Sequence, residues 1–502
     1  MTRTTWKSKF GFLMAAAGSA IGLGNIVFFP ANAYRFGAGA FYLPYLIALI
    51  FLGIPIIIME LGIGRAFKKG FPSSMKEVAG FKGEMTGWFA ILNSSVITMY
   101  YITILGWVLG MLIRSFSSLW TQVAVPEFGI EAGTAPIGIS HFFSIISSPG
   151  TAGLVIIVWI MNIFCILKGT KTIEKIVKIL VPSMWIFMII MIIRGLTLPG
   201  GFQGLFLLFT PDMSILTSAE VWKGAFSQIF FTLSLGFGIM TTYASYLPKK
   251  SDIVNDGLSV TFMNCTFEMI AGIAIFTLLF AFSISPRAST LGMMFFVMPE
   301  GIAQFPGATV TIFGVLFFTL LLSAGLTSSM SLLETVASAI IDKFSISRKK
   351  ALLIIFVVGL SGSIMFSLPH VIDPELNASG TLGLTLLDFL DHWAFGYGLL
   401  LTGFLQTIFI GWVFGADRLR TLLNENSKWT IGVWFNPLIK FLIPGIIALL
   451  LGSGIFSEFS GLYGHSSTGS IDNLHIYALV FWIFFAAGGS FLLAKMKGGT
   501  ND

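Results

Sequence analysis

Charged residues are scarce in this chain. Only 10% of its 502 residues are Asp, Glu, Lys or Arg, whereas 55% are hydrophobic. A soluble domain usually has about 25% charged residues, and water could not be kept from so many apolar side chains. A bilayer accommodates them, because lipid is itself an apolar solvent. The composition therefore predicts an all-α polytopic membrane protein, with residues 1–502 forming a single transmembrane domain.

The chain also lacks the residue patterns of common enzyme sites. Its two cysteines, Cys165 and Cys265, provide neither a disulfide framework nor metal-ligand spacing. No phosphate-binding loop, nucleophile elbow or zinc-binding helix motif occurs. We therefore expect no enzymatic activity, no organic cofactor and no nucleotide-driven pump. The net charge of +6 is interpreted as topology and contact with anionic membrane lipid, with no nucleic-acid binding.

Long apolar runs are abundant, and a run of about 20 residues can cross a bilayer as a helix. Most of the 29 Lys and Arg residues fall on the side of the N-terminus, which predicts cytoplasmic termini in the cell membrane of a bacterium. The twelve predicted transmembrane helices are 9–35, 40–66, 86–115, 151–169, 172–195, 222–247, 254–284, 308–344, 349–369, 381–415, 434–455 and 474–495.

Glycine-rich interruptions occur in the first and the sixth segments, at 17–25 and 228–238. Each alone would fit close helix packing, since glycine is common in membrane helices. Their five-segment separation instead predicts two inverted five-helix repeats, 9–195 and 222–415, followed by two additional helices at 434–495. Backbone groups freed at mid-membrane need partners. Helix N-termini attract anions and open carbonyls attract cations, so this site suits a zwitterion and a metal ion.

These interruptions and several other motifs resemble the neurotransmitter:sodium symporter family, in its bacterial amino-acid branch. The resemblance spans nearly the whole chain. It rests on Gly18-Ser19-Ala20-Ile21-Gly22-Leu23-Gly24-Asn25, Phe29-Pro30, Gly53-Ile54-Pro55, Glu60, Tyr100-Tyr101, Gln228 to Gly238, Tyr243-Ala244-Ser245-Tyr246, Asn264 and Ala324-Gly325-Leu326-Thr327-Ser328-Ser329.

The resemblance implies two sodium sites built from neutral oxygen atoms, which suit a hard cation. The first would use Ala20, Asn25, Thr232 and Asn264, and the substrate carboxylate would complete it. The second would use Gly18, Ile21, Ala324, Thr327 and Ser328. Outside the motif, the hydroxyls of Thr327 and Ser328 would more simply serve helix packing.

The resemblance also implies a substrate pocket with apolar walls. Such walls favour a neutral, hydrophobic or aromatic L-amino acid over a charged one. The amides of Leu23 and Gly24 and the Tyr101 hydroxyl would hold its carboxylate. The full set of expected substrate-binding residues is Ser19, Ala20, Gly22, Leu23, Gly24, Ile97, Tyr101, Phe231, Thr232, Ser234, Phe237, Ser328 and Leu332.

Two acidic residues fall inside predicted helices, where a carboxylate is costly and usually functional. Glu268 lies four residues after Asn264, on the same helical face. Animal members of the family have a neutral residue here and require chloride, so Glu268 is expected to replace chloride, with proton exchange as an extension. A protonated core Glu is the alternative. Glu60 is expected to brace the unwound backbone.

Gate residues follow from the same resemblance. Arg3, Trp6, Tyr246 and Asp342 would close the cytoplasmic side, and Arg3 would pair with Asp342. Tyr101 and Phe231 would form an outer aromatic lid.

The outer gate departs from the family pattern. Phe28 stands where the family usually has Arg, which leaves its expected partner Asp391 without that cation. Arg35, His392 or water are the candidate replacements. An ordinary role for Asp391 in the outer vestibule is equally compatible with the sequence.

The expected function is sodium-coupled, chloride-independent symport of a neutral amino acid by alternating access. Its partners would be the amino acid, two sodium ions, membrane lipid and, in a homodimer, a second copy of the chain. A proton-coupled carrier of the same fold is one alternative, because Glu60 and Glu268 could carry protons. A non-transporting substrate sensor is the other.

Overall fold

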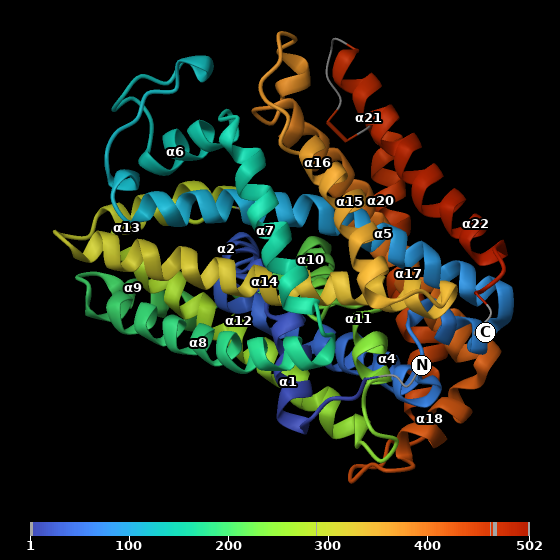
Figure 1. Cartoon of the computed structure of the whole chain (residues 1–502). Coiled ribbons are helices and arrows are strands. Elements are labelled where there is room, and N and C mark those ends of the chain that lie inside the picture. The colour runs from blue at the N-terminus through green and yellow to red at the C-terminus, as the bar shows by residue number, and fades with distance from the viewer. Residues whose placement is uncertain (1–3, 288, 462, 465–468, 500–502) are drawn as a thin grey trace.

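The computed structural model describes residues 4–287, 289–461, 463–464 and 469–499, and Figure 1 shows them as a helical bundle. Within these residues there is no strand, only an isolated bridge between Val125 and Ile130. Arg3, expected in the cytoplasmic gate, lies outside the described residues. The predicted all-α class is confirmed.

The described helices correspond to the twelve predicted segments. Eight runs have the length and hydropathy of a membrane span, and two bent pairs do so if each pair is one span. The interrupted pair α10–α11 and the shorter α15 complete the set. In chain order the spans are α1–η1–α2 (Lys9–Ala20, Gly24–Phe28, Phe29–Arg35), η2–α3–η3–α4 (Ala38–Phe41, Tyr42–Ala48, Leu49–Gly53, Ile54–Phe67), α5 (Phe71–Ser115), α7 (Gly150–Ile166), α8 (Thr170–Thr197), α10–α11 (Ala219–Thr232, Ile239–Ser245), α12 (Ile253–Ala281), α14 (Thr309–Phe344), α15 (Arg348–Met365), α16–η9–α17–η10–α18 (Leu382–Asp391, His392–Gly398, Leu399–Ile408, Phe409–Gly415, Ala416–Asn424), α19–η11–α20 (Phe435–Pro437, Leu438–Leu442, Ile443–Ser460) and α21–η12–α22 (Ser470–Trp482, Ile483–Gly488, Gly489–Lys495).

The connections contain short helices where the sequence indicated only loops. These are α6 (Ile137–Ile146), α9 (Gly201–Phe209) and η7–α13 (Gly292–Val297, Met298–Ala303), with short 3-10 turns between some of them. The α5 helix also begins about four turns before the predicted span. It contains a kink at Ala79 and Gly80, where Gly80 has φ +58°.

The first span is broken as predicted. Helix α1 ends at Ala20, Ile21 is extended (φ −74°, ψ 94°), and the chain resumes in the π-helical turn η1. The two halves differ in direction by 54°. A chain bent in this way cannot continue the i to i−4 hydrogen bonds across the break, so backbone groups around 21–24 are open to other partners.

The sixth span is also broken, between Thr232 and Ile239. Ser234, Gly236 and Gly238 all have positive φ, of 53°, 79° and 77°. Glycine adopts this left-handed region without a Cβ penalty, which explains two of the three positions. Ser234 is the exception, and its hydroxyl is hydrogen-bonded to the first span, as described below.

The broken spans lie in the middle of the bundle. Helix α1 packs against α8 and α14, α5 packs along α14, and α11 packs against α4. The best-matching stretches of the second span and of α5 are 72% buried, whereas those of α8, α19–α20 and α21–α22 are 28%, 22% and 22% buried. The latter spans therefore form part of the lipid-facing surface, and α21 and α22 lie at one edge of the bundle in Figure 1.

Candidate functional site

A cavity of about 130 Å³ lies between the two breaks. All of the residues expected to bind substrate line it, so the structure brings them together from the first, third, sixth and eighth spans. The lining also includes residues not expected there, namely Asn25, Phe28, Gln228, Ile239 and Phe395. None of the described lining residues is Asp, Glu, Lys or Arg.

One end of the cavity is shaped around the backbone at Gly22 and Leu23. The Leu23 amide points at the Tyr101 hydroxyl oxygen, 3.5 Å away. A Cβ placed on Gly22 would lie 2.9 Å from Ser328 Oγ and 3.3 Å from Tyr101 Oη. The space above Gly22 is therefore enclosed by hydrogen-bonding groups, and a side chain there would occupy it.

The hydroxyls of three helices converge on Ser19, one residue before the end of α1. The carbonyl of Ser19 accepts hydrogen bonds from Ser234 Oγ at 3.2 Å and Ser328 Oγ at 3.1 Å. Its own hydroxyl lies 2.7 Å from Ser331 Oγ. These bonds join the two broken spans to α14, which accounts for the left-handed conformation that Ser234 adopts.

Aromatic rings cover another side of the cavity. Phe231 stacks on Phe395, with ring centroids 4.0 Å apart and planes 19° apart. Phe28 and Tyr101 also line this cavity. Phe395 was missed from the sequence. The only available signal was its position four residues after Asp391, in a segment rich in other aromatic residues.

Side chains of the first sodium site expected from the sequence lie within hydrogen-bond distance of one another. Asn25 Nδ2 is 3.0 Å from Thr232 Oγ1 and 2.8 Å from Asn264 Oδ1. Asn264 Nδ2 donates to Thr232 Oγ1 at 2.9 Å, and the Gly22 amide donates to Asn25 Oδ1 at 2.8 Å. Residues far apart in the chain thus form one compact, neutral polar cluster between α12 and the two breaks.

The second expected sodium set lies where α1 ends against α14. A Cβ on Gly18 would be 3.4 Å from Thr327 Cβ, so the helices approach closely there. Thr327 Oγ1 donates to the Ala324 carbonyl at 2.9 Å, a bond within α14, and Ile21 follows the last residue of α1. The oxygen atoms of this set therefore come from two elements in contact.

Glu268 is fully buried beside the first cluster. Its carboxylate accepts hydrogen bonds from Thr232 Oγ1 at 2.7 Å, from Gln228 Nε2 at 2.8 Å and from the Tyr45 hydroxyl. Gln228 is in turn held by Asn32 Nδ2 at 3.0 Å. Thr232 therefore connects the carboxylate directly to Asn25 and Asn264. Tyr45 had no signal in the sequence, because it lies in an ordinary apolar run.

Glu60 contacts the unwound backbone of the sixth span, as its interpretation as a brace predicts. Its Oε1 accepts from the Gly236 amide at 3.0 Å and from Gln406 Nε2 at 2.8 Å, and its side chain is 1% exposed. The Glu60 carbonyl also accepts from Thr241 Oγ1 at 3.1 Å. The second and tenth spans therefore hold the break in position.

The end of the bundle that carries both termini is closed by Trp6. Its indole donates to the Tyr243 carbonyl at 2.9 Å, its backbone amide donates to the Tyr246 carbonyl at 3.2 Å, and 6% of it is exposed. The Tyr246 hydroxyl donates to Glu334 Oε1 at 2.8 Å. Glu334, also fully buried, forms an ion pair with Arg348 that was not anticipated.

Asp342, the expected partner of Arg3, accepts a hydrogen bond from the Gly70 amide at 2.6 Å. It thereby connects the base of α14 to the start of α5. The Arg3–Asp342 pair itself falls outside the described residues and stays a prediction.

Neither proposed replacement for the missing outer cation pairs with Asp391. His392 Nε2 lies 2.8 Å from Glu458 Oε1, and the Arg35 guanidinium lies over the Phe36 ring, 5.1 Å from its centroid. Among the described residues, no Lys, Arg or His forms an ion pair with Asp391. Phe28 is instead part of the cavity lining, so an apolar ring stands at this position.

Comparison with known proteins matches this arrangement to one family. A profile of the sodium:neurotransmitter symporter family matches residues 3–128 and 145–467. An uncharacterized sodium-dependent transporter of Methanocaldococcus jannaschii is 36% identical, over 99% of this chain and 98% of its own. The creatine transporter of Torpedo marmorata is 30% identical over 91% of this chain and 78% of its own. The crystal structure of MhsT in complex with L-phenylalanine matches with TM-score 0.75 and 32% identity, over 90% of this chain and 100% of that chain.

Proposed function

The chain belongs to the sodium:neurotransmitter symporter family, and on that basis we propose that it carries a neutral, apolar L-amino acid into the cell together with sodium ions. It is a multi-pass membrane protein and not an enzyme. The observation that carries the proposal is the cavity between the two broken spans, which has polar backbone at one end and apolar side chains around it. We further propose cytoplasmic termini; a bacterial cell membrane and a homodimer stay predictions.

The lining supports a neutral zwitterion with an apolar side chain. A carboxylate fits the space above Gly22, beside the Leu23 amide and the Tyr101 hydroxyl. A charged side chain would be buried without a partner, because the cavity presents no residue of opposite charge. Ile97, Phe231, Phe237 and Leu332 provide apolar walls instead. That MhsT was crystallised with L-phenylalanine agrees with this class of substrate.

Two sodium ions are proposed to couple substrate binding to the conformational change. The first would contact Ala20, Asn25, Thr232, Asn264 and the substrate carboxylate. The hydrogen bonds among these side chains would be exchanged for ion contacts, and neutral oxygen atoms are suitable ligands.

The second ion would join Gly18 and Ile21 to Ala324, Thr327 and Ser328. Both ligand sets connect separate elements. An ion held in this way favours the conformation in which those elements are together, which is what coupling requires.

Alternating access would use closures at both ends of the cavity. Tyr101 and Phe231 would move as the outer lid, with Phe395 behind Phe231. Trp6 and Tyr246 would separate from one another when the cytoplasmic side opens. An Arg3–Asp342 pair at the surface would be worth only about 0–1 kcal/mol, which suits a contact that breaks in every cycle.

Glu268 is proposed to make transport independent of chloride. All three of its hydrogen-bond partners can donate, so the charged carboxylate has a donor at each contact. The negative charge would stabilise a sodium ion at the adjacent cluster through Thr232. Glu268→Ser should then acquire chloride-dependent transport. As a control, Glu60→Gln should stay chloride-independent, and an unchanged chloride response in Glu268→Ser would count against the proposal.

Uptake by purified protein in proteoliposomes tests the whole proposal. Each neutral amino acid is offered under an imposed inward sodium gradient, and an apolar substrate should accumulate only with sodium present. Accumulation driven by a pH gradient without sodium would instead establish a proton-coupled carrier. Sodium-dependent binding with no uptake would establish a sensor.

A further inference from the structure

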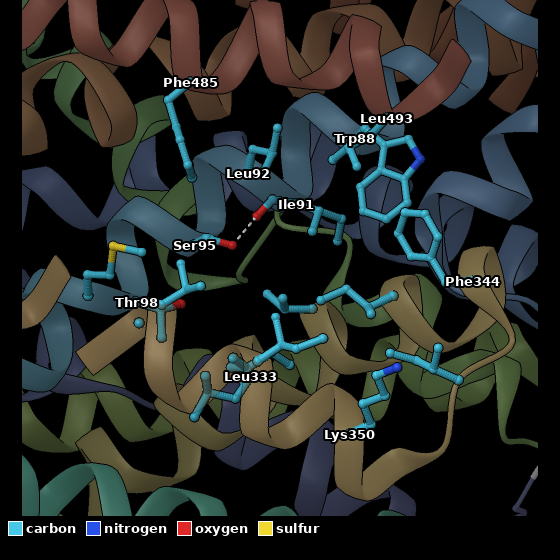
Figure 2. A pocket seen from close by; sticks show the side chains of 18 of the residues that line it. Trp88, Ile91, Leu92, Ser95, Thr98, Leu333, Phe344, Lys350, Phe485 and Leu493 are labelled. Carbon is cyan, nitrogen blue, oxygen red and sulfur yellow. Dashed lines mark hydrogen bonds between the residues drawn. The ribbon is translucent and has the colours of Figure 1, made fainter. Parts of the chain in front are cut away.

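A second, larger cavity of about 460 Å³ lies on the other side of α5 and α14 from the substrate cavity. Its walls come from α5, α14, α15 and the last span, and they are almost wholly apolar. Figure 2 shows Trp88, Phe344 and Lys350 toward one end of it and Thr98 and Phe485 toward the other. Ser95 also lines it, but its hydroxyl is hydrogen-bonded to the Ile91 carbonyl of its own helix. The cavity therefore offers shape and apolar surface rather than polar recognition.

The cavity opens toward the membrane. Two of its lining residues on α15, Ile354 and Val358, are 41% and 52% exposed. The last span, which contributes Phe485 and Leu493, belongs to the poorly buried outer surface of the bundle. A mouth between membrane-facing helices meets hydrocarbon rather than water. The natural occupant is thus an apolar chain from the bilayer.

A cation stands at the end of the cavity where α15 begins. Lys350 is exposed, and its amine forms no ion pair or hydrogen bond with another described residue. Other basic residues at this end of the bundle are engaged. Lys343 pairs with Glu84 and Arg348 pairs with Glu334. A lysine near the end of a membrane helix attracts anionic head groups, so the occupant should carry a negative charge.

The cavity shares two walls with the substrate cavity. On α5, Ile97 faces the substrate cavity and Thr98 faces the second cavity. On α14, Leu332 and Leu333 divide in the same way. An occupant of the second cavity would therefore press on the two helices that also enclose the substrate.

We propose that this cavity binds an anionic phospholipid, with one acyl chain between α5, α14 and α15 and its phosphate at Lys350. The bound lipid fills space between helices that protein side chains leave open. It stabilises the packing of α5 against α14, and it does so whether or not the chain transports an amino acid.

Lipid retention by the purified full-length protein measures this directly. The probes are dioleoyl phosphatidylglycerol, dioleoyl phosphatidylcholine and oleate, each added to delipidated protein and counted by native mass spectrometry. Wild-type protein should retain phosphatidylglycerol severalfold better than phosphatidylcholine. Equal retention of both phospholipids would overturn the role of the negative charge, and retention of oleate in place of phosphatidylglycerol would identify a free fatty acid as the occupant.

Two neighbouring valines provide a matched pair of variants. Val358→Trp places a large ring in the mouth, whereas Val357→Trp, 54% exposed and outside the cavity lining, adds the same ring elsewhere on α15. Val358→Trp should lose phosphatidylglycerol retention severalfold, and Val357→Trp should keep it. Ser95→Leu fills the opposite wall and serves if Val358→Trp does not fold. Equal retention by the filled and control variants would overturn the proposal.

The head-group contact has its own pair. Lys350→Gln should lower retention of phosphatidylglycerol but not of phosphatidylcholine, while Lys171→Gln, an exposed lysine on α8, should change neither. Phosphatidylglycerol should also raise the thermal unfolding temperature of wild type and not of Val358→Trp, because a ligand stabilises the state that binds it. If Val358→Trp instead shifts the monomer–dimer ratio with lipid retention intact, the cavity face is an interface between two copies and the lipid assignment is wrong.

Discussion

Thr232 connects the proposed sodium cluster to Glu268, and its removal is the sharpest test of the site. Its hydroxyl accepts hydrogen bonds from Asn25 at 3.0 Å and Asn264 at 2.9 Å, and it donates to Glu268 at 2.7 Å. Thr232→Val keeps the shape of the side chain and replaces the hydroxyl by a methyl group. The substitution therefore removes one proposed sodium ligand and the only direct link between the two groups.

The structure sets the size of the effect. A hydrogen bond to a charged group contributes roughly 1.5–3 kcal/mol, and an oxygen in contact with Na⁺ belongs to that class. Because about 1.4 kcal/mol corresponds to tenfold in affinity, sodium binding should weaken roughly tenfold to a hundredfold. The free energy of unfolding should fall by about 1–3 kcal/mol, since the buried Asn264 amide loses its Thr232 partner.

The assay is a sodium titration of labelled-substrate binding to purified protein, with thermal unfolding measured on the same samples. Thr261→Val is the matched control. Thr261 lies on α12 one turn before Asn264, and its hydroxyl is buried without a hydrogen-bond partner among the described residues. That variant should bind sodium like wild type. The reasoning is refuted if Thr232→Val and Thr261→Val have the same half-saturating sodium concentration.

Three further substitutions test other parts of the site. Glu60→Leu leaves the buried Gly236 amide without its acceptor and should lower the free energy of unfolding by about 1–3 kcal/mol, whereas Glu60→Gln keeps an acceptor and should lower it less; thermal unfolding in detergent separates them. Arg348→Met leaves Glu334 buried and unpaired and should destabilise the protein by about 3 kcal/mol, near the lower end for buried pairs because Arg348 is 25% exposed; addition of Glu334→Gln should restore part of the loss in the same measurement. Gly22→Ala puts a methyl group 2.9 Å from Ser328 Oγ, in the proposed carboxylate space, and should weaken substrate affinity by tenfold or more, about 1.4 kcal/mol, in equilibrium binding; unchanged affinity would show that the carboxylate binds elsewhere.

Apolar run length and glycine position predicted the fold well. Every predicted span has a counterpart, because a chain in lipid must satisfy its backbone hydrogen bonds within a helix. Both breaks fall inside the glycine-rich runs, at 21–23 and 233–238. The short helices α6, α9 and α13 were not anticipated. They lie outside the long apolar runs, so the rule that identified the spans does not apply to them.

The site was predicted less evenly. The resemblance carried the roles of Ser19, Asn25 and Tyr101, and the structure brings all of the expected lining residues to one cavity. Phe395 and Tyr45 were missed because each is one aromatic residue among many in an apolar segment. Their importance depends on what faces them, which is Phe231 for one and Glu268 for the other.

Local sequence by itself determined where the chain crosses the membrane and where two helices lose their hydrogen bonds, because both follow from the solvent and from nearby residues. Tertiary structure alone decided that Asn25, Thr232 and Asn264, up to 239 positions apart, form one polar cluster with Glu268 beside it. It alone also left a lipid-facing cavity behind the substrate wall. Such contacts depend on the packing of several helices at once, and packing is set by all of their surfaces together rather than by any one segment.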